Sequence, residues 1–190
     1  MSSDIQTKWD AIYSDKQNSP APSLVLMQNQ HLLPKNGTAL DLACGLGGNA
    51  VLLAKAGLDV SAWDVSPVAI KQLQDFSVLN DVIIHAQVRD VLASPPKPNT
   101  LDVLVVSFFL DRDLCSSLFA ALRPGGLLFY QTYCQQKVEK IGPNNTDFLL
   151  ADNELLSLFS TMRLRVYREE SLLGEHQQGW RNQAMLVAEK

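Results

Sequence analysis

Residues 38–57, TALDLACGLGGNAVLLAKAG, contain the feature that most limits what this chain can fold into. A short apolar run leads into a turn with Gly45 and Gly47, and a helix-forming run then ends at Gly57. Glycine allows the tight backbone of such a turn and is the residue type expected just after a helix. A buried strand that passes into a helix in this way predicts a βαβ unit, in which ligands bind at the carboxyl end of the strand.

The same alternation of strand and helix continues along the chain. Further strands are expected over 59–65, 81–88, 101–109 and 127–133, and helices over 67–79, over 114–122 and from Asp152 or Asn153. Ser66 followed by Pro67 is typical of a helix N-terminus, and RPGG at 123–126 is expected to turn the chain. His85 lies inside an apolar strand and is expected to be a core residue.

Alternating strands and helices predict an α/β fold with a doubly wound, mostly parallel sheet. The last two strand-like segments, 163–168 and 184–190, are joined by a loop without a helix. We therefore expect them to pair in antiparallel fashion at the edge of a seven-stranded sheet. One domain over 1–190 is expected, made of an N-terminal segment (1–22, with a loop at 18–23), a core (37–132) and a helix with the strand pair (133–190).

Composition excludes several classes of protein. The 190 residues, 46% of them apolar, suffice for one globular core, and a net charge of −4 without a long basic run argues against a nucleic-acid partner. The chain has neither the pattern of a signal peptide nor an apolar run of ~18 residues, so a cytoplasmic location without a membrane partner is expected. Cys44, Cys115 and Cys134 are far apart, which indicates reduced thiols and no metal site. Monomer and dimer both stay open.

The glycine turn fits two kinds of ligand. Gly45, Gly47 and Ala50 match the G-x-G-x-x-A pattern that binds a dinucleotide pyrophosphate. However, Asp41 at the end of the strand would repel a pyrophosphate, whereas it would attract an ammonium or sulfonium group. Asp64 ends the second strand, 19 residues after Gly45, where a carboxylate accepts hydrogen bonds from ribose hydroxyls.

Asp90 follows the third strand and is expected either to accept a hydrogen bond from an adenine amino group or to cap a turn. Three carboxylates with little cationic charge favour a cationic nucleoside, and S-adenosylmethionine carries both an ammonium and a sulfonium without a phosphate. An NAD(P)-dependent oxidoreductase is the alternative on the same turn, but it would need a hydride-transfer acid that the sequence does not offer. A sensor that binds the cofactor without catalysis also stays open.

Several motifs in order along the chain carry a family resemblance. They are LDLACGLGGNA, AWDVSPVAI, VRDV, LDVLVVSFF and LRPGGLLFYQTY. Together, from about residue 39 to 132, they resemble the class I S-adenosylmethionine-dependent methyltransferases. DLACGxGxNA followed by LRPGG, with WDAIY and FLLADNELLSLF, resembles the tellurite-resistance and thiopurine-type branch, which methylates small molecules. Two departures are Ala43, where the family loop has its first glycine, and Gly48, where many relatives have arginine.

The resemblance and the residue pattern together predict the site. Cofactor contacts are expected from Trp9, Asp41, Ala43, Gly45, Gly47, Asn49, Asp64, Val65, Ser66, Asp90, Val91 and Ser107. A small-molecule methyl acceptor is expected near Phe108, Phe109, Tyr133 and Tyr13, although core packing explains the two phenylalanines equally well.

Trp9 and Tyr13 share one face of an expected N-terminal helix, which would act either as a lid over the cofactor or as a docking helix. No catalytic base is identified. Asp111 and Tyr133 are candidates, and Asp111 is also a candidate helix cap. A soft sulfur, selenium or tellurium acceptor would need no base, so the pattern favours such an acceptor.

Overall fold

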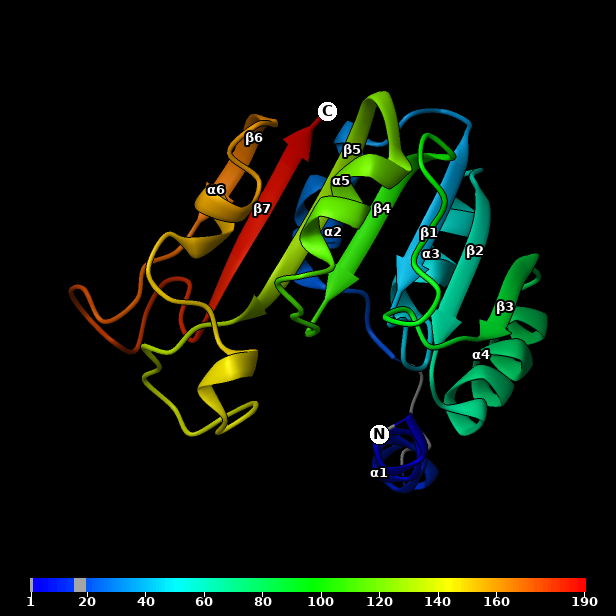
Figure 1. Cartoon of the computed structure of the whole chain (residues 1–190), viewed down its shortest axis with the longest axis horizontal. Coiled ribbons are helices and arrows are strands. Elements are labelled where there is room, and N and C mark those ends of the chain that lie inside the picture. The colour runs from blue at the N-terminus through cyan, green and yellow to red at the C-terminus, as the bar shows by residue number, and fades with distance from the viewer. Residues whose placement is uncertain (1, 16–19) are drawn as a thin grey trace.

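The computed structural model describes residues 2–15 and 20–190 and is organised around one seven-stranded sheet in the order β3-β2-β1-β4-β5-β7-β6 (Figure 1). The strands are β1 (Thr38–Leu42), β2 (Asp59–Asp64), β3 (Ile84–Val88), β4 (Leu101–Ser107), β5 (Leu122–Tyr133), β6 (Arg163–Arg168) and β7 (Gln183–Glu189). Strands β1 to β5 are parallel, and β7 is antiparallel to both of its neighbours. The predicted doubly wound sheet with an antiparallel C-terminal strand pair is therefore confirmed.

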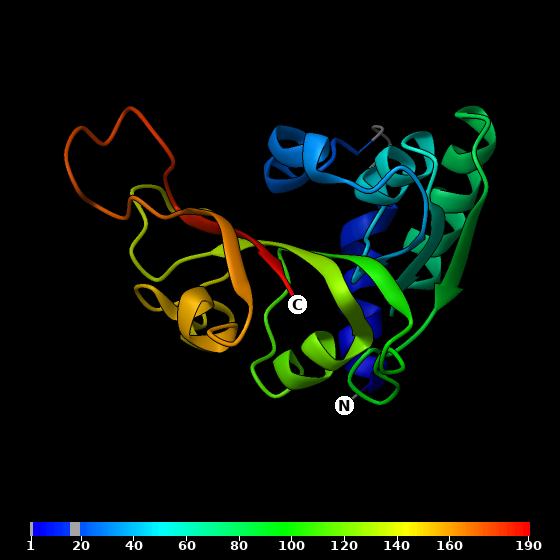
Figure 2. The same ribbon diagram turned by 90° about the horizontal axis from the view of Figure 1, so that it is seen from above.

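Helices cover both faces of the sheet. They are α1 (Ser2–Ser14), α2 (Leu24–Asn29), α3 (Gly48–Lys55), α4 (Pro67–Leu79), α5 (Cys115–Ala121) and α6 (Glu154–Leu158), with 3-10 turns η1 (Gln30–Leu32) and η2 (Thr146–Phe148). Seen from above, α2, α3 and α4 lie on one face, and α5 and α6 lie on the other (Figure 2). Of the segment 1–22, residues 1 and 16–19 lie outside the described part of the chain.

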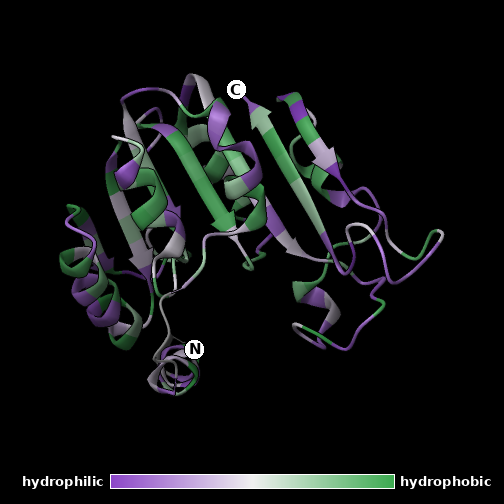
Figure 3. Cartoon of the chain, turned by 180° about the vertical axis from the view of Figure 1, so that it is seen from behind, coloured by the Kyte–Doolittle hydropathy of each residue, from purple (hydrophilic) through white to green (hydrophobic). Residues whose placement is uncertain are grey.

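The core consists of two apolar clusters, one on each face of the sheet. Residues of β4 alternate between them, since Val103 and Val105 pack with α3 and α4, whereas Leu104 and Val106 pack with α5. This double burial explains the unbroken apolar run of β4, because a parallel strand covered on both faces needs no polar side. The central strands are accordingly hydrophobic and the long loops beside β6 and β7 hydrophilic (Figure 3).

Two local signals act as predicted. The Ser66 hydroxyl accepts a hydrogen bond from the Ala69 N–H at 3.1 Å, so Ser66 is the N-cap of α4, with Pro67 as the first helical residue. Gly57 follows the last turn of α3 with a φ of 94°, the left-handed conformation that favours glycine. These two signals set the start of α4 and the end of α3.

The RPGG segment departs from its predicted role. Residues 122–133 form one strand, and its pairing with β4 shifts from Leu122 opposite Leu101 to Leu127 opposite Val103. RPGG therefore forms an irregularity inside β5 rather than a separate turn. It is held by Arg123, whose Nη1 donates to Asp102 Oδ2 at 2.6 Å.

The prediction of a core histidine at position 85 is wrong. The His85 side chain is 59% exposed, and its Nε2 lies 3.3 Å from Asp59 Oδ1. Strand β3 is at the edge of the sheet, where alternate residues face solvent even in an apolar segment.

Within the described residues, no helix has both the length and the apolar character needed to cross a membrane.

Candidate functional site

The loop between β1 and α3, residues 43–47 and called the glycine loop below, turns through positive φ angles. They are 53° at Ala43, 52° at Gly45 and 80° at Gly47. A Cβ on Gly47 would lie 2.1 Å from the Leu73 Cδ1, so only glycine lets α3 start this close to α4. Ala43 adopts the left-handed conformation without being glycine, and the family's glycine at this position would relieve that strain.

Asp64, at the end of β2, is joined to the glycine loop. Its Oδ2 accepts from the Gly45 N–H at 2.8 Å, and its Oδ1 accepts from the Ser66 N–H at 2.9 Å. The side chain is 5% exposed, and burial raises its pKa. An ionised carboxylate has about four lone-pair sites, so further donors such as hydroxyls still find an acceptor here.

Asp41 lies deeper than the sequence suggested. It is fully buried, with its Oδ2 accepting from the Ala50 N–H at 3.1 Å and its Oδ1 from the Asn49 Nδ2 at 3.3 Å. Burial raises the pKa of this carboxyl to about 8, and the nearby charge of Asp64 acts in the same direction. Asp41 therefore lies beneath the loop, against the first turn of α3, and holds a proton more strongly than a surface carboxyl does.

The amide of Asn49 joins three parts of the chain. Its Oδ1 accepts from both the N–H and the hydroxyl of Ser23, at 2.8 and 2.9 Å. Its Nδ2 donates to the Ser107 Oγ at 2.7 Å and to Asp41. The structure thus brings the predicted residues Asp41, Asn49 and Ser107 together. It adds Ser23, whose position just before the apolar residues of α2 is a helix-start signal that the sequence analysis did not use.

The residues after β2 and β3 surround the other end of the site. Asp90 Oδ1 accepts from the Leu92 and Ala93 N–H groups at 3.0 and 3.3 Å, so this carboxylate caps the turn after β3. Val91 is buried in the apolar cluster and Val65 is half-buried beside Asp64. A contact of these three residues with adenine stays a prediction, and it would involve the other carboxylate oxygen of Asp90.

Helix α1 lies across the carboxyl ends of β1 and β2 (Figure 1). Trp9 and Tyr13 lie on one face of the helix, as predicted, and their rings stack with centroids 5.6 Å apart. A Cβ on Gly45 would lie 2.8 Å from the Tyr13 hydroxyl, so α1 touches the glycine loop directly. The Gln72 Nε2 also donates to the Tyr13 carbonyl at 3.0 Å, and burial raises the pKa of the Tyr13 phenol well above its usual range.

Asp10, on the same helix, accepts a hydrogen bond from the Ser66 hydroxyl. The sequence analysis missed Asp10, because a single acid in a polar helix carries no local signal of a contact with a residue far along the chain.

The candidate acceptor residues at the ends of β4 and β5 have different surroundings. Phe108 has a φ of 57° and is 45% exposed, and its ring lies 5.2 Å from that of Tyr133. Phe109 instead packs against the apolar core. Burial raises the pKa of the Tyr133 phenol, which keeps it protonated, and Asp111 accepts from the Leu114 N–H at 3.0 Å as a cap before α5. The Tyr133 phenol is therefore not prepared to act as a base, and Asp111 serves as a cap through one of its two carboxylate oxygens.

Gly48 shows why one family position differs here. A Cβ at Gly48 would lie 2.7 Å from the carbonyl oxygen of Ala21 and 2.8 Å from that of Pro20. The backbone that leads into α2 thus occupies the space that an arginine side chain would need. The same segment continues to Ser23, so it also contributes to the contacts of Asn49.

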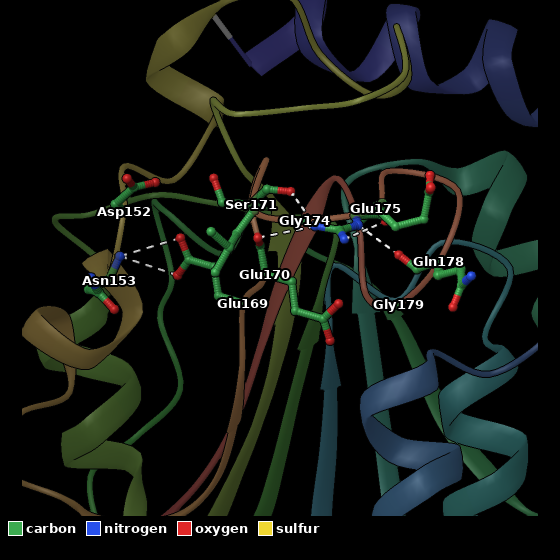
Figure 4. A pocket seen from close by; sticks show the side chains of 11 residues that line it. Asp152, Asn153, Glu169, Glu170, Ser171, Gly174, Glu175, Gln178 and Gly179 are labelled. Carbon is green, nitrogen blue, oxygen red and sulfur yellow. Dashed lines mark hydrogen bonds between the residues drawn. The ribbon is translucent and has the colours of Figure 1, made fainter.

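A separate cavity of about 680 Å³ lies at the far end of the sheet, in the loop between β6 and β7 (Figure 4). Glu169 and Asp152 border one side, and Glu175 and Gln178 border the other. Arg181 shapes this loop by donating to four backbone carbonyls, those of Glu170, Ser171, Glu175 and Gln178. The lining residues do not include the glycine loop or the ends of β1, β2 and β4, so this cavity is distinct from the candidate site.

Over 2–15 and 20–190, no three His, Cys, Asp or Glu side chains form a group suited to a metal ion.

Comparisons with known proteins agree with this geometry. The family model described as a methyltransferase domain matches residues 39–126. The chain is 29% identical over 154 residues to O-methyltransferase 3 of Dictyostelium discoideum, covering 68% of this chain and 35% of that protein. It is 28% identical over 109 residues to the malonyl-[acyl-carrier protein] O-methyltransferase of Salmonella typhimurium, covering 55% of this chain and 42% of that protein. The chain thus spans less than half the length of these two relatives.

Among solved structures, TehB from Haemophilus influenzae has the same fold. It superposes with a TM-score of 0.74 at 22% identity, covering 96% of this chain and 67% of that chain. Strand order and the glycine loop between β1 and α3 are therefore those of the Rossmann-like methyltransferase fold, and residues 39–126 of the chain match a methyltransferase domain.

Proposed function

We propose that this chain transfers a methyl group from S-adenosylmethionine to a small-molecule acceptor. The observation that carries the proposal is the buried carboxylate of Asp64, which the Gly45 N–H holds at the end of β2 beside a second buried carboxylate, Asp41. Two buried acids next to a glycine loop disfavour a pyrophosphate and favour a ligand that offers hydroxyl donors and positive charge. The residues present therefore fit this cofactor.

The residues would have distinct roles toward the cofactor. Asp64 would accept from the ribose hydroxyls, and the free oxygen of Asp90 would accept from the adenine amino group, with Val65 and Val91 as apolar neighbours. When bound, the cofactor supplies a methyl group already activated on its sulfonium. The chain itself then needs to align donor and acceptor and to exclude water. Trp9 and Tyr13 on α1, which touches the glycine loop, are placed to exclude water.

The acceptor that fits best is a small molecule with a soft sulfur, selenium or tellurium nucleophile. Phe108 and Tyr133 would border it, because their rings lie at the ends of β4 and β5 and Ser107 links that edge to Asn49. Burial keeps Tyr133 protonated, so the phenol beside Phe108 offers no base and an acceptor that needs none is favoured. The exposed ring of Phe108 offers an apolar surface for such an acceptor.

Calorimetric titration with S-adenosylmethionine and with NADH tests the cofactor. We expect binding of the first alone, and binding of NADH alone would refute the proposal. Turnover to S-adenosylhomocysteine is then measured with thiols, thiopurines and tellurite. Methylation of at least one of these acceptors is expected. Tight cofactor binding without turnover on any of them would instead favour a sensor.

A further inference from the structure

Asp10 connects α1 to the acidic part of the candidate site. Its carboxylate accepts from the Ser66 hydroxyl, which itself accepts from the Ala69 N–H as the cap of α4. The backbone N–H of Ser66 donates to Asp64. When α1 lies on the glycine loop, Asp10 is therefore separated from Asp64 by a single residue, Ser66.

The docked helix thus adds the carboxylate of Asp10 to a region that already holds the acidic side chains of Asp64 and, beneath the glycine loop, Asp41. Asp41 and Asp64 are both buried, and each has its pKa raised by desolvation and by a neighbouring carboxylate, which for Asp64 is Asp10. Neighbouring carboxylates repel one another, and this repulsion is larger in a partly buried site than in water. Docking of α1 is therefore favoured most when a positive charge occupies the site.

We propose that Asp10 makes the docked position of α1 select the positively charged methyl donor over its neutral-sulfur product. This inference rests on the proposed function. The donor loses the positive charge of its sulfonium when the methyl group leaves, so the product has one positive charge fewer to offset the carboxylates of Asp10 and Asp64. Helix α1 then holds the product less strongly, which favours its release. Asp10 thereby acts as a specificity-determining residue between the two ligands.

The test compares three ligands on the full chain. Dissociation constants for S-adenosylmethionine, S-adenosylhomocysteine and sinefungin, which carries an amine in place of the sulfonium, are measured by calorimetry for wild type and for Asp10→Asn. The ratio of the product constant to the donor constant is expected to fall about threefold or more in Asp10→Asn, the size of one partly solvated charge interaction. Sinefungin is expected to follow the donor. Asp4→Asn, the same change elsewhere on α1, is the control and should leave the ratio unchanged.

Trypsin cleavage after Lys8 reports the docking of α1 independently of affinity. In wild type at saturating ligand, cleavage should be slower with the donor than with the product, and in Asp10→Asn the two rates should agree. If Asp10→Asn weakens all three ligands by the same factor, Asp10 is only structural and the inference is wrong. If the wild type binds none of the three, the proposed function fails as well. Donor binding with an unaltered ratio in Asp10→Asn refutes this inference alone.

Discussion

The protonation of Asp41 should couple the affinity for S-adenosylmethionine to pH. In the ligand-free chain, burial raises the pKa of this carboxyl to about 8, so Asp41 is mostly protonated at neutral pH. A cationic ligand favours the ionised form, so binding should release the proton of Asp41. Affinity is therefore expected to rise as the pH rises toward 8. Above that pH Asp41 adds no further increase, because it is already ionised in the free protein.

The size of the pH effect on affinity follows from the raised pKa of Asp41. Ionising a group with a pKa of about 8 at pH 7 costs about 1.4 kcal/mol, and this cost is subtracted from the binding free energy. If Asp41 is fully ionised in the complex, affinity should change by about tenfold per pH unit below 8. Between pH 6 and pH 8 the dissociation constant should thus fall about 50-fold, because half of Asp41 is still protonated at pH 8.

Calorimetry in buffers of different ionisation enthalpy measures the released protons directly. The comparison protein is Asp41→Asn, which lacks the proton that Asp41 would release. Asp64 and the α-amino group of the ligand, which has a pKa of about 8, still titrate in this variant and contribute equally to both proteins. Wild type should release nearly one proton more than Asp41→Asn at pH 7. Identical pH profiles for the two proteins would show that Asp41 does not exchange a proton on binding, and the electrostatic reasoning would then be wrong.

Three further substitutions test the geometry of the loop and its neighbours. Ala43→Gly should raise the free energy of unfolding by about 1 kcal/mol in urea titrations, because it relieves the φ of 53°, and a lower midpoint would contradict this. Gly48→Ala should lower the stability by about 1–3 kcal/mol, because its Cβ would lie 2.7 Å from the Ala21 carbonyl oxygen, and an unchanged midpoint would mean that this segment packs elsewhere. Asp64→Ala should weaken binding of S-adenosylmethionine by about 1–3 kcal/mol in calorimetry, and unchanged affinity would remove Asp64 from the site.

Much of the fold could be predicted from local patterns. The glycine turn, the Ser66 cap and the apolar run of β4 each depend on residues close in sequence, and each has the predicted structure. The antiparallel pairing of β6 and β7 followed from the lack of a helix between them. These signals suffice because backbone conformation and burial period are local properties.

The errors come from arrangement in space. His85 is exposed because β3 is the edge strand, and the apolar pattern of one segment does not state its place in the sheet. The irregularity in β5 depends on Arg123 reaching Asp102, a contact between separate strands. The contact of Asp10 with Ser66 spans 56 residues, so only the packing of α1 on α4 reveals it.

The bonding of Asn49 has a mechanical consequence. Both atoms of one amide are shared among the stretch before α2, the tip of β4 and the base of the glycine loop. None of these parts can shift alone without breaking a buried bond. The glycine loop on the side of the methyl donor and the end of β4 on the side of the acceptor should therefore move as one rigid body. The distance between the two reactants is then set by the scaffold and not by independent loops.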